Sequence, residues 1–318
     1  MQKSLTAKNI TDIQNANTTA NYTMNELADR FVKYLDVSAL SIKSYISGVR
    51  KFLTFLNSQG ITLPTRDTVI LYKKTLCEKY TANTTALYLS ALRRFFSWCQ
   101  SEGLYSDITA GVKSPHIDTG HKKDCFTANQ LKTIIGGIER NSLKGKRDYA
   151  LFCLISATGL RTVEIQRADI SDIRNVQGEN VLYIMGKGKT SKSQFVKLSG
   201  HVLQAIRAYL EMRGAVADDE PLFASLSHRN YGGRMTTKSI SRICKSAMIN
   251  AGFNSRRLTA HSLRHTSITL ALLAGMSLQD VSQFARHSNI SVTMIYSHDI
   301  DRLKSRCEMA ISEAIFGA

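Results

Sequence analysis

The chain has 318 residues, enough for two ordinary domains, and its 43% apolar content excludes an intrinsically disordered protein. Lysine and arginine number 42 against 25 aspartates and glutamates, and the formal charge of +17 favours a polyanionic partner, nucleic acid before an anionic membrane surface. No apolar run reaches the ~18 residues of a membrane span, and the N-terminal stretch contains no apolar signal core. We therefore expect a soluble cytoplasmic protein.

The sequence contains no pattern typical of a metal or nucleotide site. The six cysteines are widely spaced without a C-x-x-C pair, which argues against zinc and against a disulfide framework. Neither a Walker loop nor a G-x-G-x-x-G fingerprint occurs. We expect the chemistry of this protein to need no cofactor.

Residues 23–104 predict an all-helical domain behind a flexible tail, residues 1–22. Apolar residues recur at helical spacing in four stretches, which together suit a small bundle. The first stretch begins at Met24, and the other three cover about 39–59, 67–80 and 83–102. The basic residues of this domain suit contacts with DNA phosphates and ordinary solvated faces equally well. They include Lys43, Arg50, Arg93 and Arg94.

Residues 105–124 have the composition of a linker between two domains. The segment contains two glycines, a proline and the basic pair Lys122 and Lys123. A charged tether suits a clamp that closes round a duplex, with the lysines on DNA, and it is equally consistent with a plain linker.

The remaining residues, 125–318, predict a mixed domain. Apolar strands over 181–185 and 194–198 flank the basic stretch GKGKTSKS, which is typical of a β-hairpin, and 169–174 is expected to add a third strand. Helices are expected over about 128–139, 143–158, 199–213, 237–251 and 259–273, with an amphipathic tail over 301–316. The expected fold class is mainly α with a small β-sheet, in two domains.

The segment from His261 to Tyr296 places polar side chains at successive helix ends. His261 and Arg264 are three residues apart on a predicted helix, so both project from one face. His287 follows 23 residues after that arginine, and Tyr296 nine residues later. Each residue alone is more often structural than functional, but the joint pattern is specific.

A second motif, ATGLRTVEI, contains Arg161 and Glu164. Together the two motifs resemble those of the tyrosine site-specific recombinases, the family of Cre, phage lambda integrase and the Xer proteins. The resemblance covers about residues 24–316. It implies a C-shaped clamp made of an all-helical core-binding domain and a mixed α/β catalytic domain. It also implies an enzyme that breaks and rejoins DNA without metal or ATP.

The resemblance implies roles for the arginines and the tyrosine. Arg161 and Arg264 would hold the scissile phosphate, because a guanidinium stays protonated and donates to phosphate through two N–H groups. Glu164 would orient Arg161. Tyr296 would attack the phosphate and leave a 3′-phosphotyrosine and a free 5′-hydroxyl, which religates through a Holliday junction.

The proton transfers fall to histidines and to a hairpin lysine. His261 would be a general base or a phosphate ligand, and His287 a hydrogen-bond donor to the phosphate. Lys187, in the G-K-G context of the hairpin, would protonate the departing 5′-oxygen. Lys189 and Lys192 are near enough in sequence to take that role or to bind the DNA backbone.

Three further residues lie beside these motifs. His265 and His298 are interpreted as structural, although His298 could help to order the segment around Tyr296. Arg286 stands where many relatives have the glycine of Leu-Gly-His, and it adds a positive charge beside the site.

The implied partner is double-stranded DNA with paired inverted-repeat sites, bound by a homo- or heterotetramer. The helix expected over 307–316, with apolar Met309, Ile311, Ile315 and Phe316, would either dock into a neighbouring copy or pack on its own domain. The favoured function is a bacterial Xer-like resolvase or a mobile-element integrase. Two alternatives stay open: a type IB-like topoisomerase, and a non-catalytic DNA-binding regulator on the same scaffold.

Overall fold

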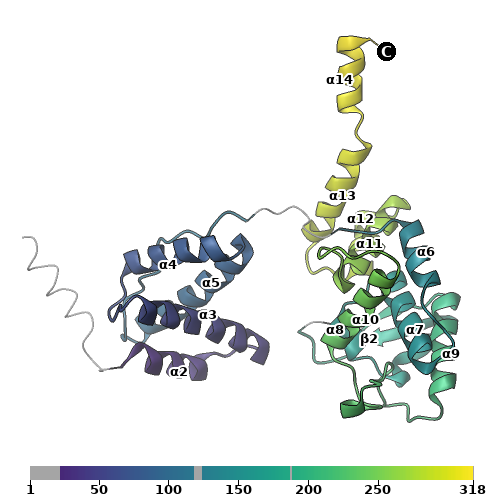
Figure 1. The fold of residues 1–318 in the computed structure, drawn as a ribbon, viewed down its shortest axis with the longest axis horizontal. Coiled ribbons are helices and arrows are strands. Elements are labelled where there is room, and N and C mark those ends of the chain that lie inside the picture. The colour runs from purple at the N-terminus through teal and green to yellow at the C-terminus, as the bar shows by residue number, and fades with distance from the viewer. Residues whose placement is uncertain (1–21, 118–123, 187, 318) are drawn as a thin grey trace, which may run out of the picture. The chain divides into compact units, whose positions relative to one another are not determined.

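The computed structural model describes residues 22–117, 124–186 and 188–317, without the side chains of 299–304. The chain divides into two compact units, Met1–Thr119 and Gly120–Ala318 (Figure 1). The predicted fold class is confirmed, because both units are mainly helical and only the second contains a sheet among its described residues. No helix of the described residues is both long and apolar enough to cross a membrane.

The first unit is a bundle of four helices. They are α2 (Met24–Tyr34), α3 (Ala39–Ser58), α4 (Arg66–Lys79) and α5 (Ala82–Ser101). The hydroxyl oxygens of Thr23, Ser38 and Thr81 accept backbone N–H groups at three of the N-termini, which explains where those helices begin. Gly48 lets α3 approach α5 closely, since a Cβ there would lie 2.5 Å from the Ala91 Cβ.

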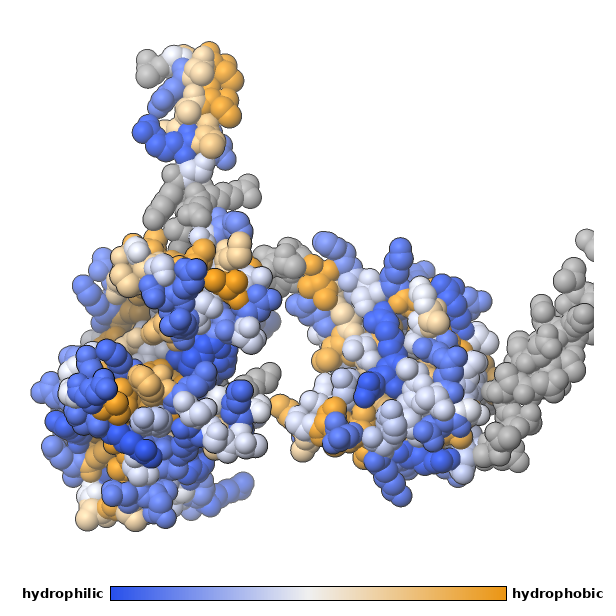
Figure 2. All heavy atoms as spheres, turned by 180° about the vertical axis from the view of Figure 1, so that it is seen from behind, coloured by the Kyte–Doolittle hydropathy of each residue, from blue (hydrophilic) through white to orange (hydrophobic). Residues whose placement is uncertain are grey.

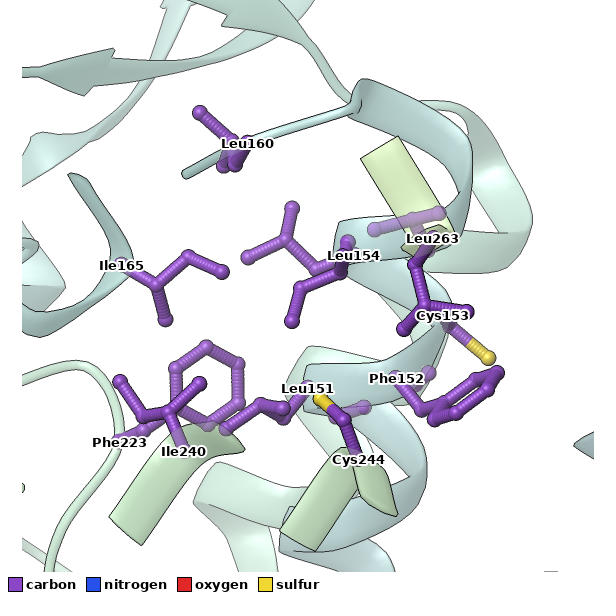
Figure 3. Close-up of a cluster of buried hydrophobic side chains, with 14 of the residues drawn as sticks. Leu151, Phe152, Cys153, Leu154, Leu160, Ile165, Phe223, Ile240, Cys244 and Leu263 are labelled. Carbon is purple, nitrogen blue, oxygen red and sulfur yellow. The ribbon is translucent and has the colours of Figure 1, made fainter. Parts of the chain in front are cut away.

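The second unit is built around the buried helix α7. Its described helices are α6 (Ala128–Gly136), α7 (Leu143–Thr158), α8 (Thr162–Gln166), α9 (Gly200–Arg213), α10 (Thr237–Asn250), α11 (Ala260–Leu273), α12 (Leu278–Ala285), α13 (Ser291–Lys304) and α14 (Cys307–Phe316). Leu151 and Leu154 of α7 meet Ile165 of α8, Ile240 of α10 and Leu263 of α11 in one apolar cluster (Figure 3). This core holds α8 and α11 in fixed positions, and both carry predicted site residues.

The sheet of the second unit has three antiparallel strands in the order β1 (Ile173–Val176), β2 (Glu179–Ile184) and β3 (Gln194–Lys197). Leu182 of β2 pairs with Ile173 on one side and Val196 on the other. The hairpin was predicted. The expected strand over 169–174 is wrong in its first half, where the Asp172 carboxylate accepts the Asp169 N–H and closes a 3₁₀ turn over Ile170–Asp172. The tail is two helices, α13 and α14, with a break after Lys304.

Candidate active site

Arg161 lies at the corner between α7 and α8. Gly159 ends α7 in the left-handed region, at φ 58°, which redirects the chain toward α8. Arg161 then donates to the carboxylate of Glu164, through its backbone N–H at 2.8 Å and through Nη1 at 3.1 Å. Because Glu164 is fully buried and the Arg161 side chain is 29% exposed, the carboxylate fixes a guanidinium that solvent and ligand still reach.

Arg264 projects from the buried face of α11 toward the same corner. Its Nη1 donates to the Gly159 carbonyl at 2.6 Å, and its Nη2 donates to the Ala285 carbonyl at the end of α12. Burial, and then the like charges of Arg161 and Arg286, lower the pKa of Arg264 to about 10. The guanidinium is therefore still protonated at neutral pH.

A cleft of 870 Å³ brings together five of the six predicted catalytic residues. They are Arg161, His261, Arg264, His287 and Tyr296. The sixth, Lys187, lies outside the described residues, but its neighbour Lys189 lines the cleft. His265 and Arg286 line it as well. The cleft thus combines several cationic groups with one phenol, which is the chemistry required to bind and attack a phosphate.

Tyr296 of α13 is nearly buried, at 6% exposure, against Ile268, Val281 and Ala285. Its hydroxyl is hydrogen-bonded to Nδ1 of His265. Burial raises the pKa of Tyr296 to about 12, although Arg264 and Arg161 act in the opposite direction. The phenol is therefore neutral in this arrangement, and its reaction as a nucleophile requires a group that takes its proton.

His265 was interpreted as structural from the sequence, but it is the partner of Tyr296. It follows His261 by four residues on α11, and the two rings lie 4.5 Å apart between centroids. The His265 ring is also 5.3 Å from that of Tyr296. The i,i+4 spacing from His261 was the available signal, since such residues share a helix face.

His287 follows α12 and hydrogen-bonds through Nδ1 to Thr293 Oγ1 at 2.8 Å. Burial lowers the pKa of His287 to about 4, with further contributions from Arg264, Arg161, Arg286 and His261. The imidazole is consequently neutral at physiological pH. A neutral ring held by Thr293 through one nitrogen keeps the other nitrogen for a ligand.

The three hairpin lysines have different surroundings. Lys187 lies outside the described residues, and Lys189 lines the cleft. Lys192 donates to the carboxylates of Asp169 and Asp172, so it ties the hairpin to the 3₁₀ turn. Of the two described lysines, Lys189 is therefore the one that is positioned for the cleft.

The basic residues predicted to bind DNA from the first unit lie beside two surface grooves. Lys43 and Arg50 line one groove along α3, and Arg93 and Arg94 line another. Arg93 also donates to the Val112 carbonyl at 2.7 Å and to Ser114 Oγ at 3.1 Å, so part of its role is to hold the segment after α5. The remaining predicted contacts, Lys122 and Lys123, lie outside the described residues.

Comparison with known proteins adds family and fold information to this geometry. The model of the phage integrase family matches residues 124–302, and that of the phage integrase N-terminal SAM-like domain matches residues 28–103. The tyrosine recombinase XerD of Rhizobium meliloti (strain 1021) is 28% identical over 275 residues, which cover 83% of this chain and 86% of the relative. XerA of Thermococcus onnurineus (strain NA1) is also 28% identical, over 90% and 96% of the two chains.

Two solved structures share the fold. XerH recombinase bound to palindromic difH substrate, in a post-cleavage complex, aligns with a TM-score of 0.72 at 20% identity over 98% of this chain and 90% of its own. A lambda integrase (75–356) dimer bound to a COC′ core site aligns with a TM-score of 0.67 at 18% identity, over 85% and 97%.

Proposed function

Because the chain belongs to the phage integrase family, we propose that it is a site-specific DNA recombinase that works through a phosphotyrosine intermediate. The observation that carries this proposal is the convergence of Arg161, Arg264, His287 and Tyr296 on one cleft, from elements that are far apart in sequence. The chemistry of the cleft fits a phosphodiester, and the described residues contain no cluster of three or more typical metal ligands.

A phosphodiester repels nucleophiles because it is negatively charged, and the two arginines counter that charge. Arg161 is held by a hydrogen bond to the Glu164 carboxylate, and Arg264 is held by hydrogen bonds to the carbonyls of Gly159 and Ala285. The N–H groups that remain on the two guanidiniums are the donors for the non-bridging phosphate oxygens. Such preorganised donors stabilise the charge that develops in the transition state.

In the proposed cleavage step, the Tyr296 oxygen attacks phosphorus while its proton passes to His265, to which it is already hydrogen-bonded. The Tyr296 O–P bond forms and the P–O5′ bond breaks, which leaves a 3′-phosphotyrosine. A hairpin lysine gives a proton to the departing 5′-oxygen. The phosphodiester is exchanged rather than hydrolysed, so a second 5′-hydroxyl reverses the step without ATP.

The adduct itself is the direct test of this function. The protein selects binding duplexes from a random-sequence library, and these are rebuilt with a nick beside the cleavage position so that religation fails. Denaturing gels should show a protein–DNA adduct with the wild type and none with Tyr296→Phe, which lacks only the hydroxyl. An adduct that persists in the phenylalanine variant would exclude Tyr296 as the nucleophile.

The lysine that protonates the departing 5′-oxygen can be identified with a substrate whose leaving group needs no proton. Replacing the bridging 5′-oxygen by sulfur creates a thiolate leaving group, and its conjugate thiol is far more acidic than an alcohol, so it leaves without a proton. We expect either Lys187→Ala or Lys189→Ala to lower cleavage of ordinary DNA by about 100-fold or more and to recover near wild-type cleavage on the sulfur substrate. A variant that stays slow on both substrates has lost something other than the general acid.

The alternatives are less well supported. A type IB-like topoisomerase would relax supercoiled plasmid of any sequence, whereas a recombinase acts at its own site. A non-catalytic regulator would bind DNA without forming an adduct, and a complete set of arginines, histidines and tyrosine in one cleft would then have no function. The adduct and relaxation assays separate all three.

We further propose that the enzyme acts as a tetramer on paired inverted-repeat sites and that α14 joins its subunits. Helix α14 buries none of its residues. Apolar side chains gather along one side of it, as the uppermost helix of Figure 2 shows. They are Met309, Ile311, Ile315 and Phe316, each at least 58% exposed. Such a helix favours burial in an apolar groove of another copy.

A further inference from the structure

Arg286 has an unusual backbone conformation for its residue type. It ends α12 in the left-handed region, at φ 54° and ψ 47°, where glycine suffers no steric penalty and a side chain with a Cβ does. Among the described residues, Gln177 in the exposed β1–β2 turn is the other non-glycine with positive φ. Unlike that turn, the bend at Arg286 immediately precedes His287 and lies in the wall of the cleft.

The Arg286 side chain is buried, at 6% exposure, and it connects the supports of both phosphate-binding arginines. Its Nη2 donates to Glu164 Oε2 and to the Gly159 carbonyl, both at 3.2 Å, and its Nη1 donates to the Phe284 carbonyl at 2.7 Å. Glu164 is also the acceptor of Arg161, and the Gly159 carbonyl is also an acceptor of Arg264. Each acceptor is therefore shared between Arg286 and one of the two arginines.

The charge balance of this cluster is unfavourable without an anion. Three guanidiniums lie around one carboxylate, Glu164, and burial lowers the pKa of Arg286 in spite of that carboxylate. A glycine at position 286 would relieve the backbone strain and remove one of the repelling charges. The ion pair with Glu164 and the hydrogen bonds to two carbonyls offset part of this cost, and a bound phosphate would offset more, because it adds negative charge beside the three guanidiniums.

We propose that Arg286 is a positioning residue for strand cleavage. Its guanidinium holds Glu164 and the Gly159 carbonyl in register, so that Arg161 and Arg264 direct their remaining N–H groups at the same phosphate. Its Nη2 makes two hydrogen bonds, one to the acceptor of each of the other two arginines, and its side chain is buried, so we assign it a role that acts through Arg161 and Arg264. This inference rests on the recombinase function proposed above.

The positioning role of Arg286 is tested by single-turnover cleavage of the selected nicked duplex, with Arg286→Gly and Arg286→Lys as the variants. The glycine variant keeps the left-handed bend and removes the bridge, so we expect its cleavage rate to fall by about tenfold or more, because small displacements of catalytic groups have effects of this size. Its affinity for the duplex should change little, and its melting temperature should be unchanged or higher. Lysine keeps the positive charge but lacks the planar guanidinium that donates to two acceptors at once. The cleavage rate of Arg286→Lys should therefore lie between those of the wild type and Arg286→Gly.

Chemical rescue separates positioning from a merely structural role. Millimolar methylguanidinium should restore part of the cleavage rate of Arg286→Gly, and equal concentrations of sodium chloride should not. Wild-type cleavage by Arg286→Gly, or a rate loss that follows a lower melting temperature in both variants and shows no rescue, would overturn the inference. If the wild type itself forms no adduct, the proposed function fails first; a wild-type adduct with an equally active glycine variant removes only the role of Arg286.

Discussion

The phenol of Tyr296 is neutral and nearly buried, so its reactivity depends on the group that receives its proton. His265 Nδ1 is hydrogen-bonded to it, and the rings of His261 and His265 are adjacent on α11. His265 therefore lies between the nucleophile and His261, and all three side chains line the cleft. Among the individual residues, the pair Tyr296–His265 is the feature whose chemistry is most directly testable.

Substitution of His265 should slow cleavage without weakening DNA binding. Phenylalanine removes the acceptor, whereas asparagine places an amide oxygen near the position of Nδ1 and serves as the matched control. We expect both His265→Phe and His265→Asn to lower the single-turnover cleavage rate by about 100-fold, a typical effect of losing a general base, because an amide accepts a hydrogen bond but does not take the proton. Equal cleavage rates for the wild type and His265→Phe would show that the role of His265 is purely structural.

Protonation of His287 should weaken the fold in mild acid. Its pKa is lowered to about 4 from 6.5, so below pH 6.5 the unfolded chain takes up a proton that the folded chain refuses. The stability associated with His287 is complete above pH 6.5 and is lost as the pH falls toward 4, by on the order of 1 kcal/mol after discounting for a partly exposed ring. Melting temperatures of wild type and His287→Asn over this range check the prediction, and the asparagine variant should show the smaller decline.

Among the secondary-structure elements, the corner between α7 and α8 contacts all three arginines of the cleft. The Gly159 carbonyl accepts from both Arg264 and Arg286, and Arg161, two residues later, is the N-cap residue of α8. The helix predicted over 143–158 ends at this corner, because the glycine that follows it suits a left-handed helix end. The hairpin was equally predictable, because two apolar stretches flank the basic sequence GKGKTSKS. The ion pairs of Lys192 were not, since nothing local links a loop lysine to Asp169 and Asp172.

Alanine at position 159 should destabilise the protein and slow cleavage together. The backbone is at φ 58°, and a Cβ there would lie 3.4 Å from the Phe284 ring. We expect Gly159→Ala to lower the free energy of unfolding by about 1–2 kcal/mol. Urea denaturation measures this loss. Gly136, where an added Cβ would meet no atom within 4 Å, provides the control, and Gly136→Ala should be neutral or slightly stabilising.

Across the complete chain, two compact units carry different parts of the proposed function. The first unit offers basic grooves on α3 and α5, and the second contains the cleft and the exposed helix α14. The net charge of +17 makes phosphate contacts the expected main source of DNA affinity, which should therefore fall steeply with salt.

Removal of residues 306–318 should disrupt assembly but not folding. Since none of the residues of α14 is buried, the truncated protein should melt at the wild-type temperature. Its complexes with paired sites should shift from four subunits to fewer, as measured by light scattering after size exclusion. Phe316→Lys should act in the same direction, with Glu308→Lys on the same helix as the control. A lower melting temperature would instead mean that α14 packs on its own domain.

Local sequence patterns were sufficient to predict the helical first domain and the hairpin, because turn residues and periodicity are local properties. The five predicted residues that line the cleft were identified by the resemblance of two motifs to those of the tyrosine recombinases. The remaining contacts depend on tertiary packing. His265 pairs with Tyr296 from another helix, and Arg286 reaches Glu164 across 122 positions of the chain. Such contacts depend on how α8, α11, α12 and α13 pack. A buried polar group needs a hydrogen-bond partner, and the packing of these helices decides which residue is near enough to be that partner.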